Sequence, residues 1–246
     1  LFTCSGYYAS TAGYTPDYPG LENFGGPIIH PQQWPEDLDY KGKKVAVVGS
    51  GATAVTIVPN IVDDAAQVTM IQRSPTYMFS RPAKDAVANF LNAILPSKWA
   101  YALTRWKNIY MQNATYKGAR EKPEKFKKLL LGAVTKSLGA DYDVATHFTP
   151  KYNPWEERLC LIPDDDFLSA VRSGKAEVVT DTIDKVVENG VLMSSGKLVE
   201  ADILVSATGL NMQFMGGVDF SLDGKALDLS KRFYYQGMMF SGVPNL

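Results

Sequence analysis

The sequence is poor in the features that mark secreted, membrane-spanning or nucleic-acid-binding proteins. It contains only two cysteines, Cys4 and Cys160, and they form no CxxC pair. We therefore expect free thiols and a reducing compartment, the cytoplasm. The longest apolar runs are too short for a membrane-spanning helix and no signal peptide is visible, so membrane association is not expected. The net charge of −1 gives no indication of the basic face that binds nucleic acid.

Hydrophobic residues make up 46% of the 246 residues, which is enough for a substantial core in one large domain or two modest ones. The chain begins at Leu1 without a methionine and continues into residues 2–6, which have the pattern of a strand that ends in a small-residue turn. It stops at residues 242–246, which do not have the pattern of a natural C-terminus. Both ends look like the interior of a fold, so we expect a fragment of a longer protein.

A strand, a glycine-rich turn, a helix and a second strand follow one another between residues 43 and 71. Residues 43–48 form a continuous apolar run, which is typical of a buried parallel strand. A helix is predicted from Ala52 to about Val62, and residues 68–71 predict the next strand. This order is that of a βαβ unit and indicates the α/β class.

The turn has the pattern Gly49-x-Gly51-x-x-Ala54, which is the dinucleotide-binding pattern in its required context. Gly49 permits the tight turn, Gly51 lets the backbone approach a pyrophosphate, and Ala54 allows the helix to pack closely on the strand. Backbone N–H groups at the start of the helix favour phosphates. The predicted cofactor-binding residues of the turn are Gly49, Ser50, Gly51, Ala52, Thr53 and Ala54. The alternative is a small-residue turn that binds nothing.

The end of the second strand indicates which dinucleotide binds. An NAD site usually has Asp or Glu there, whereas a basic residue suits the 2′-phosphate of NADPH. The residues here are Gln72, Arg73 and Ser74, with no acid among them. Arg73 offers a planar pair of donors to a phosphate and Ser74 offers a hydroxyl. We therefore predict NADPH; the alternative is that Arg73 is only a solvated cation.

From Pro82 to about Leu138 the pattern is helical and ends in a lysine-rich face, which we interpret as an insertion into the α/β domain. Trp99, Trp106 and Tyr110 are expected to pack inward, and a substrate entrance or a membrane surface is the alternative. The aspartates at 164–166 fit a helix start rather than a metal site, and no metal is predicted. The α/β pattern then resumes with a helix at 167–171 and strands at 176–179, 183–187, 190–193 and 201–207.

Five residues stand at fixed offsets before the βαβ unit: Phe24, Gly26, His30, Trp34 and Pro35, here called the fingerprint. They fit the pattern Phe-x-Gly-x-x-x-His-x-x-x-Trp-Pro, so the chain resembles the Baeyer–Villiger monooxygenases of the flavin-containing monooxygenase superfamily. Other members have Phe or Tyr in place of Trp34. The resemblance implies that His30 couples cofactor movement to the reaction at a domain junction; alone, it would be read as a loop histidine satisfied by its neighbours.

The resemblance extends over most of the chain. Residues 2–8 resemble the strand and turn that precede the fingerprint, and residues 148–160 resemble the segment that brings an arginine to the flavin. Residues 243–246 resemble the start of the last FAD-contacting stretch. The turn at which the chain leaves the NADP domain is matched by Ala207, Thr208 and Gly209.

Arg158 is the candidate catalytic residue. The resemblance implies that it stabilises a negatively charged flavin peroxide, a role that suits a guanidinium because it never deprotonates. The alternative is a surface arginine paired with Glu156 or Asp164. The family often has Lys immediately before this arginine, where it assists the 2′-phosphate, whereas this chain has Glu157. That departure leaves Arg73 to bind the phosphate.

The expected fold is α/β: a doubly wound, Rossmann-like NADPH-binding domain with a helical insertion and a partial FAD-binding domain. Residues 1–42 are expected to be an FAD-domain remnant and the fingerprint linker. Residues 43–81 and 148–207 are expected to form the two parts of the NADPH-binding domain, on either side of the insertion at 82–147. Residues 208–246 are expected to return into the FAD domain.

The resemblance implies an enzyme that uses FAD, NADPH and O₂ to insert one oxygen atom next to a ketone carbonyl, giving an ester or lactone. One alternative is oxygenation of nitrogen or sulfur by the same flavin peroxide. Another is an inactive NADPH-binding module, because the chain as given lacks the family's first FAD-binding glycine pattern. The predicted partners are a small ketone and O₂, without nucleic acid. Neither the particular ketone nor the oligomeric state is predicted.

Overall fold

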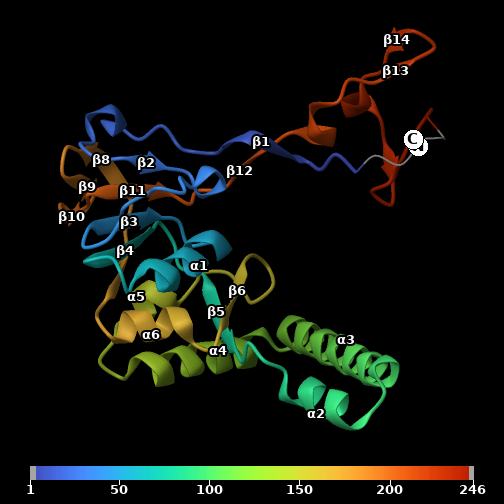
Figure 1. Ribbon diagram of the computed structural model, residues 1–246, viewed down its shortest axis with the longest axis horizontal. Coiled ribbons are helices and arrows are strands. Elements are labelled where there is room, and N and C mark those ends of the chain that lie inside the picture. Colours follow the sequence, from blue (N-terminus) through green and yellow to red (C-terminus); the bar gives the residue numbers. More distant parts are fainter. Residues whose placement is uncertain (1–3, 244–246) are drawn as a thin grey trace. The chain divides into compact units, whose positions relative to one another are not determined.

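The computed structural model describes residues 4–243. Their contacts divide the chain into two compact units (Figure 1). One unit is Thr15–Thr208, and the other combines Leu1–Tyr14 with Gly209–Leu246. The domain boundaries expected at residues 42, 81, 147 and 207 stay predictions.

A five-stranded parallel sheet is the centre of the Thr15–Thr208 unit. Its strand order is β2-β11-β3-β4-β7, and every neighbouring pair is parallel. The strands are β2 Ile28–Ile29, β11 Ile203–Ser206, β3 Lys44–Val48, β4 Gln67–Gln72 and β7 Ala176–Thr180. The helix α1 (Ala52–Ile61) joins β3 to β4, as the predicted βαβ unit requires. The α/β class with a parallel sheet is therefore confirmed.

Both faces of this sheet are buried, because its side chains alternate between two cores. In β3, Val45 and Val47 belong to one core, whereas Ala46 and Val48 belong to the other. The first core lies against helices α1, α4, α5 and α6, and the second against a three-stranded antiparallel sheet (Figure 1). These covering elements, besides α1, are α4 Pro123–Leu138, α5 Val144–Phe148, α6 Asp166–Arg172, β8 Ile183–Val187, β9 Gly190–Met193 and β10 Leu198–Glu200.

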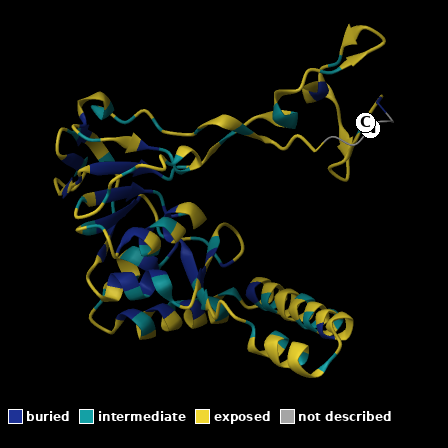
Figure 2. Cartoon of the chain, viewed as in Figure 1, coloured by how far each residue is buried: buried dark blue, intermediate teal, exposed yellow. Residues whose placement is uncertain are grey.

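The helical segment expected from Pro82 to Leu138 consists of three helices, α2 Ala86–Ile94, α3 Ser97–Glu121 and α4 Pro123–Leu138. Asp85 caps α2 by accepting the N–H of Ala88 at 3.1 Å. α4 buries Leu130 and Val134, but α3 has only Ala100 and Ala119 fully buried. Most of α2 and α3 is exposed (Figure 2).

The expectation that Trp99, Trp106 and Tyr110 pack inward is wrong. Their exposed fractions are 67%, 70% and 75%. The reason is geometric, since α3 faces its neighbours with small residues such as Ala100 and Ala119 and turns its large side chains away. No helix among residues 4–243 is both long and apolar enough to cross a bilayer.

Two strands that the sequence analysis missed form a separate parallel pair, β5 (Tyr77–Arg81) with β6 (Leu159–Pro163). In this register Tyr77 lies opposite Leu159. The pair places the residues just before each strand, Thr76 and Arg158, side by side. Two short 3₁₀ helices complete the unit, η1 Leu21–Asn23 and η2 Pro31–Gln33.

The other unit contains short antiparallel pairs. β1 (Tyr8–Gly13) pairs with β12 (Leu210–Met212). Its remaining elements are η3 Phe214–Gly217, β13 Ser221–Leu222, β14 Lys225–Ala226, η4 Leu229–Lys231, β15 Tyr234–Tyr235 and β16 Met239–Phe240.

Of the strand and small-residue turn expected at residues 2–6, the structure describes residues 4–6, which include the expected turn. Residues 4–6 are not a strand, and β1 begins only at Tyr8. Phe2 and Thr3 lie outside the described residues, as do residues 244–246 of the expected last FAD-contacting stretch. Gly6 has a φ of +77°, which is a turn conformation and does not continue a strand.

Candidate nucleotide-binding site

The glycine turn after β3 has room for a ligand at one glycine and none at the other. Gly49 has a φ of +138°, and a Cβ there would lie 2.3 Å from the carbonyl oxygen of Ala207. At Gly51 a Cβ would meet no atom within 4 Å. Gly51 precedes α1, whose start is not capped by any side chain. The turn therefore presents open space and a helix N-terminus, the arrangement that binds a pyrophosphate.

Most of the predicted site residues follow the carboxyl ends of four adjacent parallel strands. His30 follows β2, Ala207 follows β11, Gly49 follows β3 and Arg73 follows β4. Because parallel strands end at the same edge, these residues lie along one edge of the sheet, which is the edge at which α/β sheets bind ligands. Thr208 is fixed there by a hydrogen bond of 2.7 Å between its hydroxyl and that of Ser206.

Ser50 connects this turn to the neighbouring strand ends. Its buried hydroxyl donates to the carbonyl of Ser74 at 3.3 Å and accepts from the hydroxyl of Thr76 at 3.4 Å. The thiol of Cys160 donates to the Ser50 carbonyl at 3.8 Å, and burial raises the pKa of that thiol. The glycine turn is thereby linked to the end of β4 and to the β5–β6 pair.

The guanidinium of Arg158 also contacts the hydroxyl of Ser50. Its Nη2 lies 3.5 Å from the Ser50 Oγ and its Nε lies 3.4 Å from the Thr76 Oγ1. Within residues 4–243, Arg158 forms no ion pair with Glu156 or Asp164. The Glu156 carboxylate accepts from Asn153 and the Asp164 carboxylate accepts from the N–H of Ala83. The candidate catalytic arginine is thus held at the glycine turn by neutral hydroxyls, and its charge stays available to a ligand.

At the end of β4, the Gln72 side chain is buried and supports the structure, whereas the Arg73 side chain is exposed. Gln72 points inward, where its amide donates to the carbonyl of His147 and to the hydroxyl of Thr180, both at 2.8 Å. The His147 Nδ1 lies 2.8 Å from the same Thr180 hydroxyl, and burial lowers the pKa of His147. Arg73 is exposed, as a residue that binds a phosphate from solvent must be. No pattern in the sequence indicated the supporting roles of Gln72 and Thr180.

The first two fingerprint residues hold the linker against the sheet. Phe24 belongs to the second core. Gly26 passes so close to β11 that a Cβ there would lie 2.0 Å from the carbonyl oxygen of Asp202. This close approach lets β2 pair with β11, with Ile28 opposite Leu204.

The other fingerprint residues shape the approach to α1. The Nδ1 of His30 accepts the N–H of Gln32 at 3.2 Å and so caps η2, which leaves the proton of a neutral ring on Nε2. Trp34 packs on the first core and meets the ring of Tyr40 edge-on, with centroids 6.4 Å apart. The carbonyl of Pro35 accepts the N–H of Leu38. An open hollow of about 510 Å³ lies beside the start of α1 and is lined by Pro31, Trp34, Ala52, Thr53, Thr56 and Ile57.

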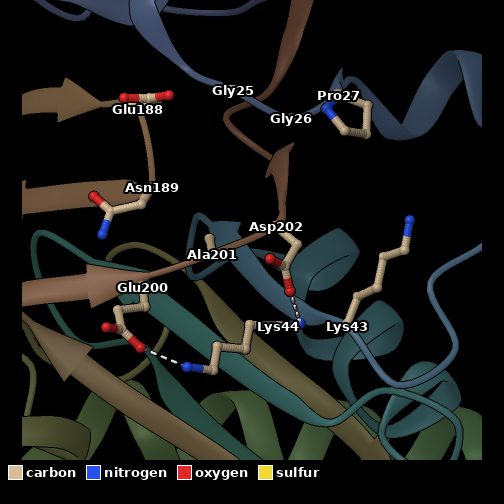
Figure 3. Close-up of a pocket in the computed structure, with 10 residues that line it drawn as sticks. All are labelled: Gly25, Gly26, Pro27, Lys43, Lys44, Glu188, Asn189, Glu200, Ala201 and Asp202. Atoms are coloured by element: carbon tan, nitrogen blue, oxygen red, sulfur yellow. Dashed lines mark hydrogen bonds and ion pairs between the residues drawn. The ribbon is translucent and has the colours of Figure 1, made fainter.

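A larger hollow of about 760 Å³ lies at the opposite edge, at the amino ends of β3 and β11 (Figure 3). Within it, the Lys44 ammonium forms an ion pair with Glu200 at 2.5 Å, and the backbone N–H of Lys44 donates to the Asp202 carboxylate at 2.7 Å. The Glu200 carboxylate raises the pKa of Lys44. Because it lies at the amino edge, this hollow is not part of the nucleotide site. Among residues 4–243 no cluster of His, Cys, Asp or Glu could hold a metal ion.

Comparison with known proteins gives a consistent match along the chain. The model of a family described as FMO-like, flavin-binding monooxygenase-like, matches residues 1–232. The FAD-containing monooxygenase EthA of Mycobacterium tuberculosis is 50% identical over 247 residues, which is all of this chain and 50% of EthA. The putative FAD-containing monooxygenase MymA of the same species is 48% identical, with 100% of this chain and 50% of MymA covered. The chain thus spans about half the length of these curated relatives.

Solved structures share the fold at lower identity. An open crystal structure of cyclohexanone monooxygenase has a TM-score of 0.64 at 21% identity, covering 85% of this chain and 48% of that one. The structure of OTEMO in complex with FAD and NADP has a TM-score of 0.65 at 17% identity, covering 86% of this chain and 47% of that one. At these identities the likeness is evidence of the fold alone.

Proposed function

The chain belongs to the flavin-binding monooxygenase-like family, and from that premise we propose that it is the NADPH-binding part of a flavin-dependent monooxygenase. The observation that carries the proposal is the contact of Arg158 with Ser50. A permanent cation is held at the glycine turn by hydroxyls, and none of the carboxylates between residues 4 and 243 forms an ion pair with it. Such a group suits a site in which a phosphate or a reacting oxygen carries negative charge.

The residues of the turn fit NADPH. The open space at Gly51 would admit the pyrophosphate, and the uncapped start of α1 would supply N–H donors and a favourable dipole. Arg73, with the hydroxyl of Ser74 beside it, would bind the 2′-phosphate. Ala207 packs against Gly49, and with Thr208 it would border the cofactor at the end of β11. Gly209 stays a predicted cofactor-binding residue.

When bound, NADPH supplies a hydride and FAD supplies the oxygen-activating chemistry. Arg158 would act by charge and position, since it cannot transfer a proton at ordinary pH. Ser50 and Thr76 would keep its guanidinium from rotating away between reaction steps. His30, whose Nδ1 is occupied by the N–H of Gln32, would keep the linker in place beside α1.

For the reaction itself we infer Baeyer–Villiger oxidation of a ketone to an ester or lactone. The support is the Trp34-Pro35 pair of the fingerprint, which the resemblance associates with that branch. The test is to supply the flavin-loaded protein with NADPH, O₂ and either a cyclic ketone or a thioether, and to identify the products. A lactone from the ketone supports the proposal. A sulfoxide without any lactone supports the heteroatom-oxygenating alternative.

A second candidate function is a nucleotide-binding module without activity, because the single compact unit Thr15–Thr208 already holds the glycine turn, Arg73 and Arg158. The visible absorbance of the purified protein separates the two. A flavin band that stays with the protein through gel filtration argues for the oxygenase. Binding of NADPH without a flavin band argues for the module.

A further inference from the structure

Helix α3 carries an apolar stripe that faces away from the rest of its unit. The stripe consists of Trp99, Leu103, Trp106 and Tyr110, at intervals of four, three and four residues. Residues at this spacing lie on one face of a helix. All four are exposed, with Leu103 at 47% the least so. The neighbouring α2 also exposes large apolar side chains, Val87, Phe90 and Ile94, at intervals of three and four.

The segment that carries this stripe is strongly basic. Residues 86–138 contain ten lysines and arginines and only two glutamates, which gives a net charge of +8, whereas the whole chain has a net charge of −1. The remaining residues therefore have a net charge of −9. Two of the ten cations form ion pairs, Lys107 with Asp85 and Lys117 with Glu121. Positive charge and exposed tryptophan are thus concentrated on the same three helices.

We propose that the stripe on α3 docks this protein on an anionic lipid surface. Tryptophan and tyrosine favour the boundary between lipid headgroups and acyl chains, and basic side chains are attracted to anionic headgroups. One basic residue continues the stripe, because Lys117 lies seven residues after Tyr110 on the same face of α3 and its side chain is 74% exposed, so it can extend toward headgroups. Such docking needs no spanning helix, because the helix lies along the surface.

The charge also argues against a second copy of the chain as the occupant. Two segments of +8 would repel each other across a shared apolar stripe. An acidic polypeptide would meet the charge requirement, but a membrane also explains why the stripe contains two tryptophans and a tyrosine that have no partners in the core. The proposal does not depend on which reaction the site performs.

The test is sedimentation of the intact protein with vesicles of phosphatidylcholine alone or mixed with phosphatidylglycerol. We expect binding to the mixed vesicles, weak binding to phosphatidylcholine, and loss of binding at high salt. Trp99→Ser combined with Trp106→Ser should lower the partition coefficient at least about tenfold, because each removes a large apolar surface that docking would bury in the lipid. The matched control is Tyr101→Ser. Tyr101 is 66% exposed on the same helix, but lies about 160° around the axis from the stripe and should not matter.

Three results would overturn the proposal. The first is no binding of wild type to mixed vesicles at low salt. The second is equal binding by the double tryptophan variant and the Tyr101→Ser control, with both folded by circular dichroism. The third is a wild-type dimer in gel filtration that the tryptophan substitutions dissociate, which would assign the stripe to a second copy. Should the double variant not fold, Trp99→Phe with Trp106→Phe keeps an aromatic side chain at both positions and is expected to retain part of the binding, with full wild-type binding counting against a role for the tryptophans.

Discussion

The guanidinium of Arg158 lies 3.5 Å from the hydroxyl oxygen of Ser50, although 108 residues separate them in the sequence. Ser50 lies inside the glycine turn, and Arg158 immediately precedes β6. The parallel pairing of β5 with β6 brings them together, because Thr76 at the start of β5 contacts both residues. A nucleotide bound at the turn would therefore meet a cation that the local sequence of the turn does not contain.

Arg158→Ala should separate the two halves of the proposed reaction. We expect oxygenated product to fall about 100- to 1,000-fold, as happens when a preorganised group that stabilises negative charge is removed. The rate of flavin reduction by NADPH should stay close to that of wild type. Stopped-flow reduction and product yield measure the two steps. Arg158→Lys should recover only part of the yield, because a lysine cannot donate to Ser50 and Thr76 with the same planar geometry.

The control for that variant is Arg105→Ala on α3, which removes an exposed arginine away from the turn and should leave product yield unchanged. A wild-type yield from Arg158→Ala would contradict the catalytic role. Equal losses in reduction and oxygenation would instead assign Arg158 to NADPH binding.

Arg73→Ala should change the choice between the two nicotinamide cofactors. Removal of a charged hydrogen bond to the 2′-phosphate should weaken NADPH binding about tenfold to a hundredfold. NADH lacks that phosphate, so its affinity should hardly change and serves as the internal control. Titration of protein fluorescence with each cofactor gives both dissociation constants. If NADH and NADPH are weakened equally, Arg73 does not contact the 2′-phosphate.

Substitution by alanine should lower stability at Gly49 and cofactor affinity at Gly51. Gly49→Ala puts a Cβ 2.3 Å from the Ala207 carbonyl at a φ of +138°, so the free energy of unfolding should fall by at least about 1–3 kcal/mol. Gly51→Ala meets no atom within 4 Å and should leave the thermal midpoint nearly unchanged. It should nevertheless weaken NADPH binding about tenfold, equivalent to about 1.4 kcal/mol. A Gly51→Ala protein that binds NADPH like wild type would show that no phosphate approaches this turn.

Local patterns predicted the central part of this fold well. The run of valines in β3, the glycine turn and the helix α1 were all expected, because each depends on residues that are adjacent in the sequence. The β5–β6 pair was not expected. Tyr77 and Leu159 lie opposite each other although the helices α2 to α5 separate them in the sequence, and short strands carry little periodicity of their own.

The fingerprint and the apolar stripe show two further limits of prediction from sequence. Gly26 is required by the carbonyl of Asp202, a partner 176 residues away that no spacing rule points to. Trp99 and Trp106 stand at helical spacing, but that spacing is the same for a stripe that faces a core and one that faces outward. Arg158 was found through resemblance to a family and not through any pattern of charge.

The stability of the protein at alkaline pH should depend on Tyr77. This residue is fully buried, and its hydroxyl donates to the carbonyl of Tyr152 at 2.8 Å. Burial raises the pKa of Tyr77 from 10.0 to about 12, and burial raises the pKa of Tyr142 to about 12 as well. Both groups stay neutral in the folded protein while the unfolded chain ionises. The stabilisation from each is therefore complete below pH 10 and is lost as the pH rises from about 10 to about 12.

Tyr77→Phe should reduce the loss of stability at alkaline pH. At neutral pH we expect it to lower the free energy of unfolding by about 1–3 kcal/mol, because the Tyr152 carbonyl loses its donor. Between pH 10 and 12 its free energy of unfolding should fall less steeply than that of wild type. The remaining slope comes from the other groups that titrate in alkali and whose pKa is raised in the fold, which are Tyr142, Tyr152, Cys160 and Lys44. Urea denaturation at a series of pH values measures both effects. The exposed Tyr101→Phe is the matched control and should reproduce the wild-type slope. If Tyr77→Phe declines as steeply as wild type, ionisation of Tyr77 is not what destabilises the fold in alkali.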